Sequence, residues 1–179
     1  MTFEVERKTI EIPMVTSKML DNNIGYVAVY EFEETTSEQF NQAIDELTAQ
    51  GMKGLIIDLR DNPGGLVNSA TAILDRILSK DQLLVYTVDK NGKKQEEYTE
   101  DDETINVPIS VLINGNSASA SEIVSGCLQD LRQSEAGRYH ILWQRHRSVC
   151  AAIGRWFSHQ ADKCQVLYAK RTQYPWNRY

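Results

Sequence analysis

Short apolar runs that alternate with segments of helical periodicity constrain this fold more than any other feature of the sequence. An apolar run at residues 24–30 is followed by a segment at 36–51 in which apolar side chains recur every three or four positions, and a second apolar run covers 54–60. Strand, helix and strand in this order predict a right-handed βαβ unit with parallel strands. Runs that are apolar almost throughout are typical of strands covered on both faces. The expected fold class is therefore α/β.

The same alternation continues toward the C-terminus. Beyond the βαβ unit, the sequence predicts a helix at 66–78, a strand at 107–113 and a helix at about 120–128. The first helix also has a start signal, because a Thr followed three positions later by Glu or Gln forms a capping box. Thr35 with Glu38, or Thr36 with Gln39, fits this pattern.

A β-hairpin is expected to interrupt the alternation. Residues 83–89 and 94–99 flank the tetrapeptide Lys90-Asn91-Gly92-Lys93. An Asn-Gly pair between two alternating runs is the strongest short-range signal for a hairpin. The expected architecture is thus an α/β core of βα units with a β-hairpin insertion, within the size of a single domain.

Two turns rich in small residues follow two of the expected buried strands. Asp61-Asn62-Pro63-Gly64-Gly65 is one, and the segment 114–121 (NGNSASAS) is the other. Ligands of open α/β sheets bind beyond the carboxyl ends of the strands, so these turns form the expected site. Ser119 fits the place of a nucleophile, because backbone amides at the start of a helix can stabilise an oxyanion. The same residues also fit a tight turn with a helix cap, and no phosphate-binding P-loop pattern is present.

A serine nucleophile needs a base, and residues 1–130 contain no histidine. A serine hydroxyl attacks poorly until a neighbouring group removes its proton. A Ser-His-Asp triad within this part of the chain is therefore excluded. The remaining option is a Ser-Lys pair, in which burial lowers the pKa of the lysine enough for it to act as the base.

Composition changes abruptly near residue 130. Residues 1–130 hold 10 Lys and Arg against 23 Asp and Glu, whereas residues 131–179 hold 9 against 2. All of the Trp and His residues also lie in the second segment. A basic arm that binds nucleic acid would account for the charge. It would not explain why Trp, His and Cys gather there, so we expect no nucleic-acid partner.

The sequence favours neither a metal site nor a membrane span. Cys150, His159 and Cys164 do not match the spacing of a compact zinc site, and a fourth ligand is not evident. Cys127 lies in an apolar helical stretch, where we expect a small buried residue. The sequence has neither an apolar run long enough for a transmembrane helix nor the layout of a signal peptide at its start. We expect no cofactor.

Residues 54–65 (GLIIDLRDNPGG) and 111–130 (VLINGNSASASEIVSGCLQD) closely resemble the two hallmark segments of the C-terminal processing, or tail-specific, serine proteases. The resemblance covers about residues 3–130 in the same order. It implies a crotonase-like (ClpP/crotonase) fold and a Ser-Lys acyl-enzyme mechanism. It also implies protein or peptide substrates that are cleaved near their C-termini, and export of the intact parent protein.

The resemblance implies roles for individual residues. Ser119, the middle serine of Ser-Ala-Ser-Ala-Ser, corresponds to the nucleophile, and the backbone amides of Gly65 and Ala120 correspond to the oxyanion hole. Asp130 matches an acidic position that supports the site. An acyl-CoA enzyme of the crotonase type is disfavoured, because the Ser119 motif belongs to the protease branch.

The chain departs from the family pattern in two places. The PDZ domain that precedes the family's core is missing, so we expect residues 1–20 to be lead-in strands, with Pro13 limiting them to an edge or an extended connection. The family's lysine lies in a Phe-Gly-Lys-Gly segment, and Gln144 occupies its position here. We therefore expect the chain to be inactive as translated. The alternative is a non-catalytic peptide-binding or scaffold remnant.

A shifted reading frame accounts for the tail. Residues 142–146 (LWQRH) can be encoded CTT TGG CAA AGG CAT, which reads TTT GGC AAA GGC, or Phe-Gly-Lys-Gly, one base later. After this shift, the genetic code forces a glycine where Trp143 precedes Gln144 and where Trp156 precedes Phe157. Both of these forced glycines fall at positions where the family has glycine. We therefore predict a catalytic core at 21–131 and an out-of-frame tail at 132–179 that packs poorly against it.

Overall fold

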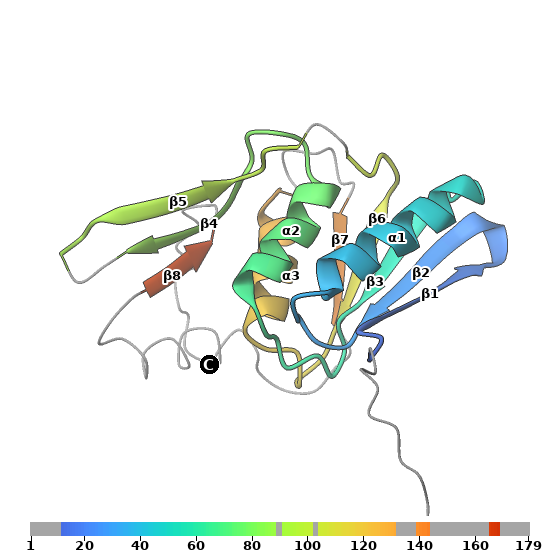
Figure 1. Cartoon of the computed structure of the whole chain (residues 1–179), viewed down its shortest axis with the longest axis horizontal. Helices are drawn as coiled ribbons and strands as arrows, with labels where there is room; N and C mark the ends of the chain where they lie inside the picture. Colours follow the sequence, from blue (N-terminus) through green and yellow to red (C-terminus); the bar gives the residue numbers. More distant parts are fainter. Residues whose placement is uncertain (1–11, 89–90, 102–103, 132–138, 144–164, 169–179) are drawn as a thin grey trace, which may run out of the picture.

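The computed structural model describes residues 12–88, 91–101, 104–131, 139–143 and 165–168, which form helices and two β-sheets (Figure 1). The helices are α1 (Thr36–Ala49), α2 (Val67–Ile77) and α3 (Ala120–Leu131), and a 3-10 turn, η1 (Asp21–Asn23), joins the first two strands. The strands are β1 (Val15–Leu20), β2 (Ile24–Val29), β3 (Gly54–Asp58), β4 (Leu83–Val88), β5 (Lys94–Tyr98), β6 (Ile109–Ile113), β7 (Tyr139–Trp143) and β8 (Gln165–Tyr168). One sheet has the order β1-β2-β3-β6-β7, and the other has the order β5-β4-β8.

The predicted βαβ unit is present in the larger sheet. β2 and β3 pair in parallel, with Ala28 opposite Asp58, and α1 connects them. β6 continues the parallel order beside β3, whereas β1 pairs antiparallel with β2 at the edge of the sheet. Pro13 precedes this edge strand, which agrees with the position that a proline allows. The fold is therefore α/β with a largely parallel sheet.

Among the described residues, the helices cover one face of this sheet. The apolar runs of the sequence predict that both faces are covered. α2 contacts both α1 and α3, so the helices form one layer (Figure 1). Burial alternates along β6, where Val111 is buried and its neighbours Ser110 and Leu112 are half-buried. The core lies between the sheet and this layer, and its largest fully buried side chains are Phe32, Phe40, Ile44, Leu47, Leu55, Ile57, Leu59, Ile73, Leu74, Ile77 and Leu78.

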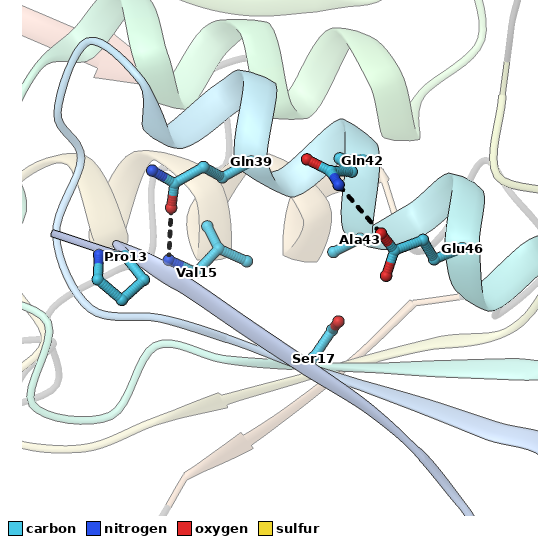
Figure 2. A pocket seen from close by; sticks show the side chains of 7 residues that line it. All are labelled: Pro13, Val15, Ser17, Gln39, Gln42, Ala43 and Glu46. Carbon is cyan, nitrogen blue, oxygen red and sulfur yellow. Dashed lines mark hydrogen bonds between the residues drawn. The ribbon is translucent and has the colours of Figure 1, made fainter. Parts of the chain in front are cut away.

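The start of α1 differs from the predicted capping box. Thr35 occupies the N-cap position, but its side chain makes no capping hydrogen bond. The Oε1 atom of Gln39 instead accepts a hydrogen bond from the backbone amide of Met14 at 2.8 Å. It also accepts one from the amide of Val15 at 3.2 Å, which Figure 2 shows. The side-chain oxygen of Gln39 therefore binds the backbone at the start of the edge strand β1. The backbone amide at the start of α1 would compete for this same acceptor in a capping box.

The hairpin was predicted correctly. β4 and β5 pair antiparallel, with Val88 opposite Lys94, and Gly92 in the connecting turn has a φ of +80°. Every residue of β5 is exposed. The Lys94 amine lies 4.0 Å from the ring centroid of Tyr86 and 3.1 Å from a carboxylate oxygen of Glu96. β4 thus anchors the hairpin in the core through the buried Leu84 and Val85, whereas β5 is held by backbone pairing and by side-chain contacts at the surface.

Two short segments of the tail form strands that the sequence analysis did not assign. β7 pairs in parallel with β6, and β8 pairs antiparallel with β4. Pairing satisfies the free N–H and C=O groups of an edge strand whatever side chains accompany it. Leu142 in β7 remains 54% exposed. The prediction of a poorly packed tail therefore does not hold for the backbone of these two segments, and its other residues lie outside those described.

Candidate active site

Two turns meet at the carboxyl ends of β3 and β6. We call residues 59–66 the glycine turn and residues 114–119 the serine turn. Three hydrogen bonds join these turns and the start of α3: the Ala118 amide donates to the Asn62 carbonyl at 3.1 Å, Ser121 Oγ donates to the same carbonyl at 3.0 Å, and Ser117 Oγ donates to the Leu59 carbonyl at 2.7 Å. The site that the sequence predicted from two separate motifs is therefore one continuous structure.

The side chain of Asn62 stabilises the glycine turn through hydrogen bonds in the protein interior. Its side chain is fully buried, where Nδ2 donates to the Val29 carbonyl at 2.8 Å and Oδ1 accepts from the Gly64 amide at 2.8 Å. The second of these bonds is an Asx turn, which Asn favours in tight turns. Sequence reasoning assigned no role to Asn62, although an Asn two residues before a glycine pair was the available signal.

A second link lies at the surface. The Asp61 carboxylate accepts hydrogen bonds from the side-chain amides of Asn114, at 3.0 Å, and Asn116, at 2.6 Å. The Asp61 amide in turn donates to Asn114 Oδ1 at 3.0 Å. The hydrogen bonds from Asn116 and Asn114 lower the pKa of Asp61 below its usual value. These bonds fix the distance between the two turns at their outer rim.

Gly64 lies against the predicted nucleophile. Its φ of +109° is in the region that favours glycine. A Cβ at this position would lie 2.7 Å from the Ala118 carbonyl oxygen, 2.7 Å from Ser119 Cβ and 3.0 Å from the Ala120 amide nitrogen. Gly65 is the next residue, so its Cα is about 3.8 Å away from that of Gly64. Gly65, Ser119 and Ala120 are thus brought together.

The loop after β2 supports this glycine pair from the other side. The Phe32 amide donates to the Gly64 carbonyl at 2.8 Å, and the Leu66 amide donates to the Phe32 carbonyl at 2.6 Å. Gly65 has a φ of +131°, and a Cβ there would overlap the carbonyl oxygen of Phe32. A side chain at Gly65 is therefore excluded by backbone atoms that have no room to move.

Ser119 immediately precedes α3, as predicted, and is half-buried. Its φ of +53° is unusual for a residue with a side chain. Among the residues that the structure describes, the amides of Gly65 and Ala120 have no hydrogen-bond acceptor, and the Ser119 hydroxyl has no partner. The described part of the site therefore presents a hydroxyl without a partner and two backbone donors without acceptors.

Glu122 is the charged side chain bonded at this point, and the sequence analysis did not single it out. Its Oε2 atom accepts a hydrogen bond from the Ser119 amide at 2.8 Å, and the residue is 8% exposed. Burial raises the pKa of its carboxyl above the usual value, and the bond from Ser119 opposes this rise. The available signal was the Ser-x-x-Glu spacing of Ser119 and Glu122.

Of the two other predicted site residues, the structure describes only Asp130, and it does not lie beside Ser119. Asp130 lies in the last turn of α3, about 15 Å along the axis from Ala120 at the usual helical rise. Burial and the negative charge of Asp130 raise the pKa of the buried Cys127 thiol to about 12. Gln144, which marks the position of the family's lysine, lies outside the described residues.

A further polar cluster lies at the end of β3, next to the glycine turn. The Tyr26 hydroxyl donates to an Asp58 carboxylate oxygen at 2.6 Å, and Arg60 Nε donates to the other at 2.9 Å. Burial alone would raise the pKa of Asp58, but the hydrogen bonds from Arg60 and Tyr26 outweigh it and hold the pKa below its usual value. This cluster braces the end of β3 where the glycine turn begins.

A cavity elsewhere does not involve the predicted site. A volume of about 310 Å³ lies between β1 and α1, lined by Pro13, Val15, Ser17, Gln39, Gln42, Ala43 and Glu46 (Figure 2).

No His, Cys, Asp and Glu side chains of the described residues group closely enough to hold a metal ion, and Cys150, His159 and Cys164 lie outside those residues. No helix in the described ranges has the length and hydrophobicity to cross a membrane.

Several known proteases are similar to this chain. The carboxy-terminal processing protease CtpA of Bacillus subtilis is 38% identical over 126 residues, which are 70% of this chain and 27% of that protein. CtpB of the same organism is 35% identical over 147 residues, covering 79% and 29%. The solved structure of a photosystem II D1 C-terminal processing protease is 28% identical with a TM-score of 0.62, covering 75% of this chain and 37% of that one.

The chain thus spans less than a third of the length of these two Bacillus relatives. A model of the family described as Peptidase family S41 matches residues 23–135, a range that contains both the glycine turn and the serine turn. Because this match extends over more than half of the sequence, the chain belongs to peptidase family S41, a family of serine peptidases.

Proposed function

We propose that this chain carries the catalytic core of a C-terminal processing serine protease with Ser119 as its nucleophile. The observation that supports this most is that Gly64, the neighbour of Gly65, packs against Ser119 and Ala120 at the start of α3. A tetrahedral intermediate of acyl transfer needs hydrogen-bond donors around its oxyanion. The names of the two Bacillus relatives favour the same reaction. The parallel sheet with its layer of helices is compatible with the crotonase-like core that we propose.

In the proposed reaction, the Ser119 oxygen attacks the carbonyl carbon of a peptide bond while a base takes the hydroxyl proton. The carbonyl oxygen becomes an oxyanion held by the amides of Gly65 and Ala120. Collapse of this intermediate breaks the C–N bond, and the base returns the proton to the departing amine. The acyl group remains as an ester on Ser119 until water hydrolyses it. The substrates would be proteins or peptides cleaved near their C-termini.

The base of this reaction is missing. Gln144 stands where the family has lysine, and a side-chain amide offers no basic nitrogen near neutral pH. Asp130 would support the site only through intervening residues, because of its distance along α3. As translated, the chain is therefore an inactive member of its family.

The same proposal divides the chain into a lead-in at 1–20, a core at 21–131 and an out-of-frame tail at 132–179. The family match ends at residue 135, close to the change in composition, which supports this division. The lead-in stands where a PDZ domain would end, and the intact parent would be an exported protein. Sequencing the gene around codons 130–132 tests the shift directly.

The experiment that tests the function compares three proteins in cleavage of an unfolded protein or a C-terminal peptide. These are the full-length parent with its frame restored near codon 131, the same protein with Ser119→Ala, and the present chain with Gln144→Lys. We expect cleavage by the first protein only, because misplacing a base by about 1 Å already costs on the order of a hundredfold in rate. Cleavage that survives Ser119→Ala would overturn the assignment of the nucleophile.

A second candidate function is a peptide-binding or scaffold remnant without catalysis, which the missing base favours. The frame-restored protein separates the two. If it binds C-terminal peptides and does not cleave them, the remnant is the correct interpretation. If the present chain with Gln144→Lys cleaves as fast as the frame-restored protein, the tail is a working scaffold and the frameshift proposal is wrong.

A further inference from the structure

Ser119 and Glu122 form only half of a capping box. In a complete capping box, the first side chain accepts a hydrogen bond from the amide three residues later, and the Glu side chain accepts one from the first amide. Here the second bond is present, from the Ser119 amide to Glu122 Oε2 at 2.8 Å. The Glu122 amide, however, donates to the Ser119 carbonyl oxygen at 2.9 Å. The start of α3 is thus capped without the Ser119 hydroxyl.

The backbone of Ser119 explains why the hydroxyl is spared. Its left-handed φ of +53° is unfavourable for a residue with a Cβ and persists only where the surroundings enforce it. Two contacts act on it: Gly64 lies against its Cβ, and the Glu122 carboxylate holds its amide. A serine at this position in ordinary extended geometry would cap the helix with its Oγ atom. That bond would withdraw the hydroxyl from a substrate.

The Glu122 carboxyl group is buried, although burial disfavours its charged form. Glu122 is 8% exposed, and its carboxylate accepts a hydrogen bond from the Ser119 amide. We infer that Glu122 is a positioning residue, which holds Ser119 in the left-handed conformation and occupies its amide. The hydroxyl is then free to attack, and the oxyanion is left to the amides of Gly65 and Ala120. This inference rests on the proposed function only for its catalytic meaning.

The test uses the present full-length chain, labelled with ¹⁵N, and measures amide hydrogen exchange and proton chemical shifts. In Glu122→Ala we expect exchange of the Ser119 amide to accelerate by about tenfold or more relative to Val124 and Leu128 in α3, since bonds to charged groups are worth at least that in an equilibrium constant. Glu122→Gln keeps an acceptor without the charge, so the Ser119 amide proton should move upfield with a smaller acceleration. Glu38→Gln is the matched control, because Glu38 is an exposed Glu at the same position of α1.

Unchanged exchange of the Ser119 amide in Glu122→Ala overturns the inference. If Glu122→Ala loosens all of α3, so that Val124 and Leu128 exchange faster as well, the Gln variant decides. An unmoved Ser119 amide proton in Glu122→Gln then rejects the inference, and an upfield shift that is missing in Glu38→Gln supports it.

The frame-restored parent supplies the catalytic half of the test. There we expect Glu122→Gln to lower kcat by about tenfold with little change in KM, because the hydroxyl is misplaced in the reaction and not in binding. A parent without any cleavage would refute the proposed protease and leave the exchange result standing. A cleaving parent whose kcat is unaffected by Glu122→Gln would refute the positioning role alone.

Discussion

The paired turns of the site and the β4–β5 hairpin are both surface connections, yet they are specified in different ways. In the turns, single side chains join residues that lie far apart in the chain, as Ser117 does with Leu59 across 58 positions and Ser121 does with Asn62 across 59. In the hairpin, all of β5 is exposed and its bonds run to the strand beside it. The hairpin therefore depends on an alternating pattern, whereas the turns depend on particular atoms.

The strongest way to break this comparison uses two glycines with positive φ. Gly64→Ala should destabilise the fold by about 3 kcal/mol or more, because a Cβ adds overlap with the serine turn to an unfavourable φ. Gly92→Ala in the hairpin turn meets no atom within 4 Å. It should cost only about 1 kcal/mol for its φ. Urea unfolding of both variants measures the difference, and equal losses would contradict the distinction.

Asn62 and Gln95 provide the next test. Asn62→Ala removes two buried hydrogen bonds and leaves the Val29 carbonyl and the Gly64 amide without their partner. We expect a loss of about 2–3 kcal/mol in the free energy of unfolding. Gln95 is exposed on β5, so Gln95→Ala should stay within about 0.5 kcal/mol of the wild type. A mild effect of Asn62→Ala would mean that water replaces the lost bonds.

Two carboxyls near the turns sharpen the comparison through opposite pH dependence. The pKa of Glu122 is raised above 4.5, so the folded state holds its proton to higher pH than the unfolded state. Its stabilising contribution is complete below 4.5 and declines as pH rises through the folded pKa. The pKa of Asp58 is lowered below 3.8, so its contribution is present above 3.8 and is lost as pH falls.

Unfolding free energies of the wild type, Glu122→Gln and Asp58→Asn across the acidic range check these signs. The advantage of the wild type over Glu122→Gln should shrink as pH rises from 4.5. Its advantage over Asp58→Asn should shrink as pH falls below 3.8. Parallel curves for the two variants would show that the burial of Glu122 does not control its titration.

The smallest effect is expected at Lys94. Its amine contacts the Tyr86 ring and the Glu96 carboxylate on an exposed strand, where solvent screens the charges. Lys94→Gln should slightly lower the urea midpoint at low salt, and the difference should vanish at about 0.5 M salt. A salt-independent loss as large as that of Asn62→Ala would place the hairpin in the same class as the turns.

Periodicity was enough to predict the elements that bury an apolar face. The helices at α1, α2 and α3, the parallel strands and the hairpin follow from spacing, turn residues and the Asn-Gly pair. Among the described residues the helices cover one face of the sheet, and cover of the other face stays a prediction, because an apolar run records that a side chain is apolar and not which part of a protein lies over it. β7 was missed because its pairing is made by the backbone, and a backbone bond leaves no trace in the choice of side chain.

The site divides in the same way. Gly65, Ser119 and Ala120 came from the family's motifs, and their catalytic roles stay a prediction, while the structure places Gly64 against Ser119 and Ala120. Asn62 and Glu122 were missed although a bonding partner of each, Gly64 and Ser119, lies only two or three residues away. Such short spacings allow several turn and cap arrangements, and the sequence alone does not select one. The capping box of Thr36 with Gln39 failed because the Gln39 side-chain oxygen accepts from the backbone amides of Met14 and Val15. Local sequence states which bonds a polar side chain is able to form, and the fold selects among them.

The wide sequence separation within the site also has a consequence for how the protein folds. Contacts across such separations carry the entropic cost of closing long loops, and the pairing of β2, β3 and β6 reduces this cost by bringing the two turns to one edge of the sheet. A nascent chain that ends before residue 114 displays the glycine turn and has no serine turn to meet it. The hydrogen bonds that hold the predicted nucleophile beside the glycine turn can therefore form only after the second turn has been synthesised.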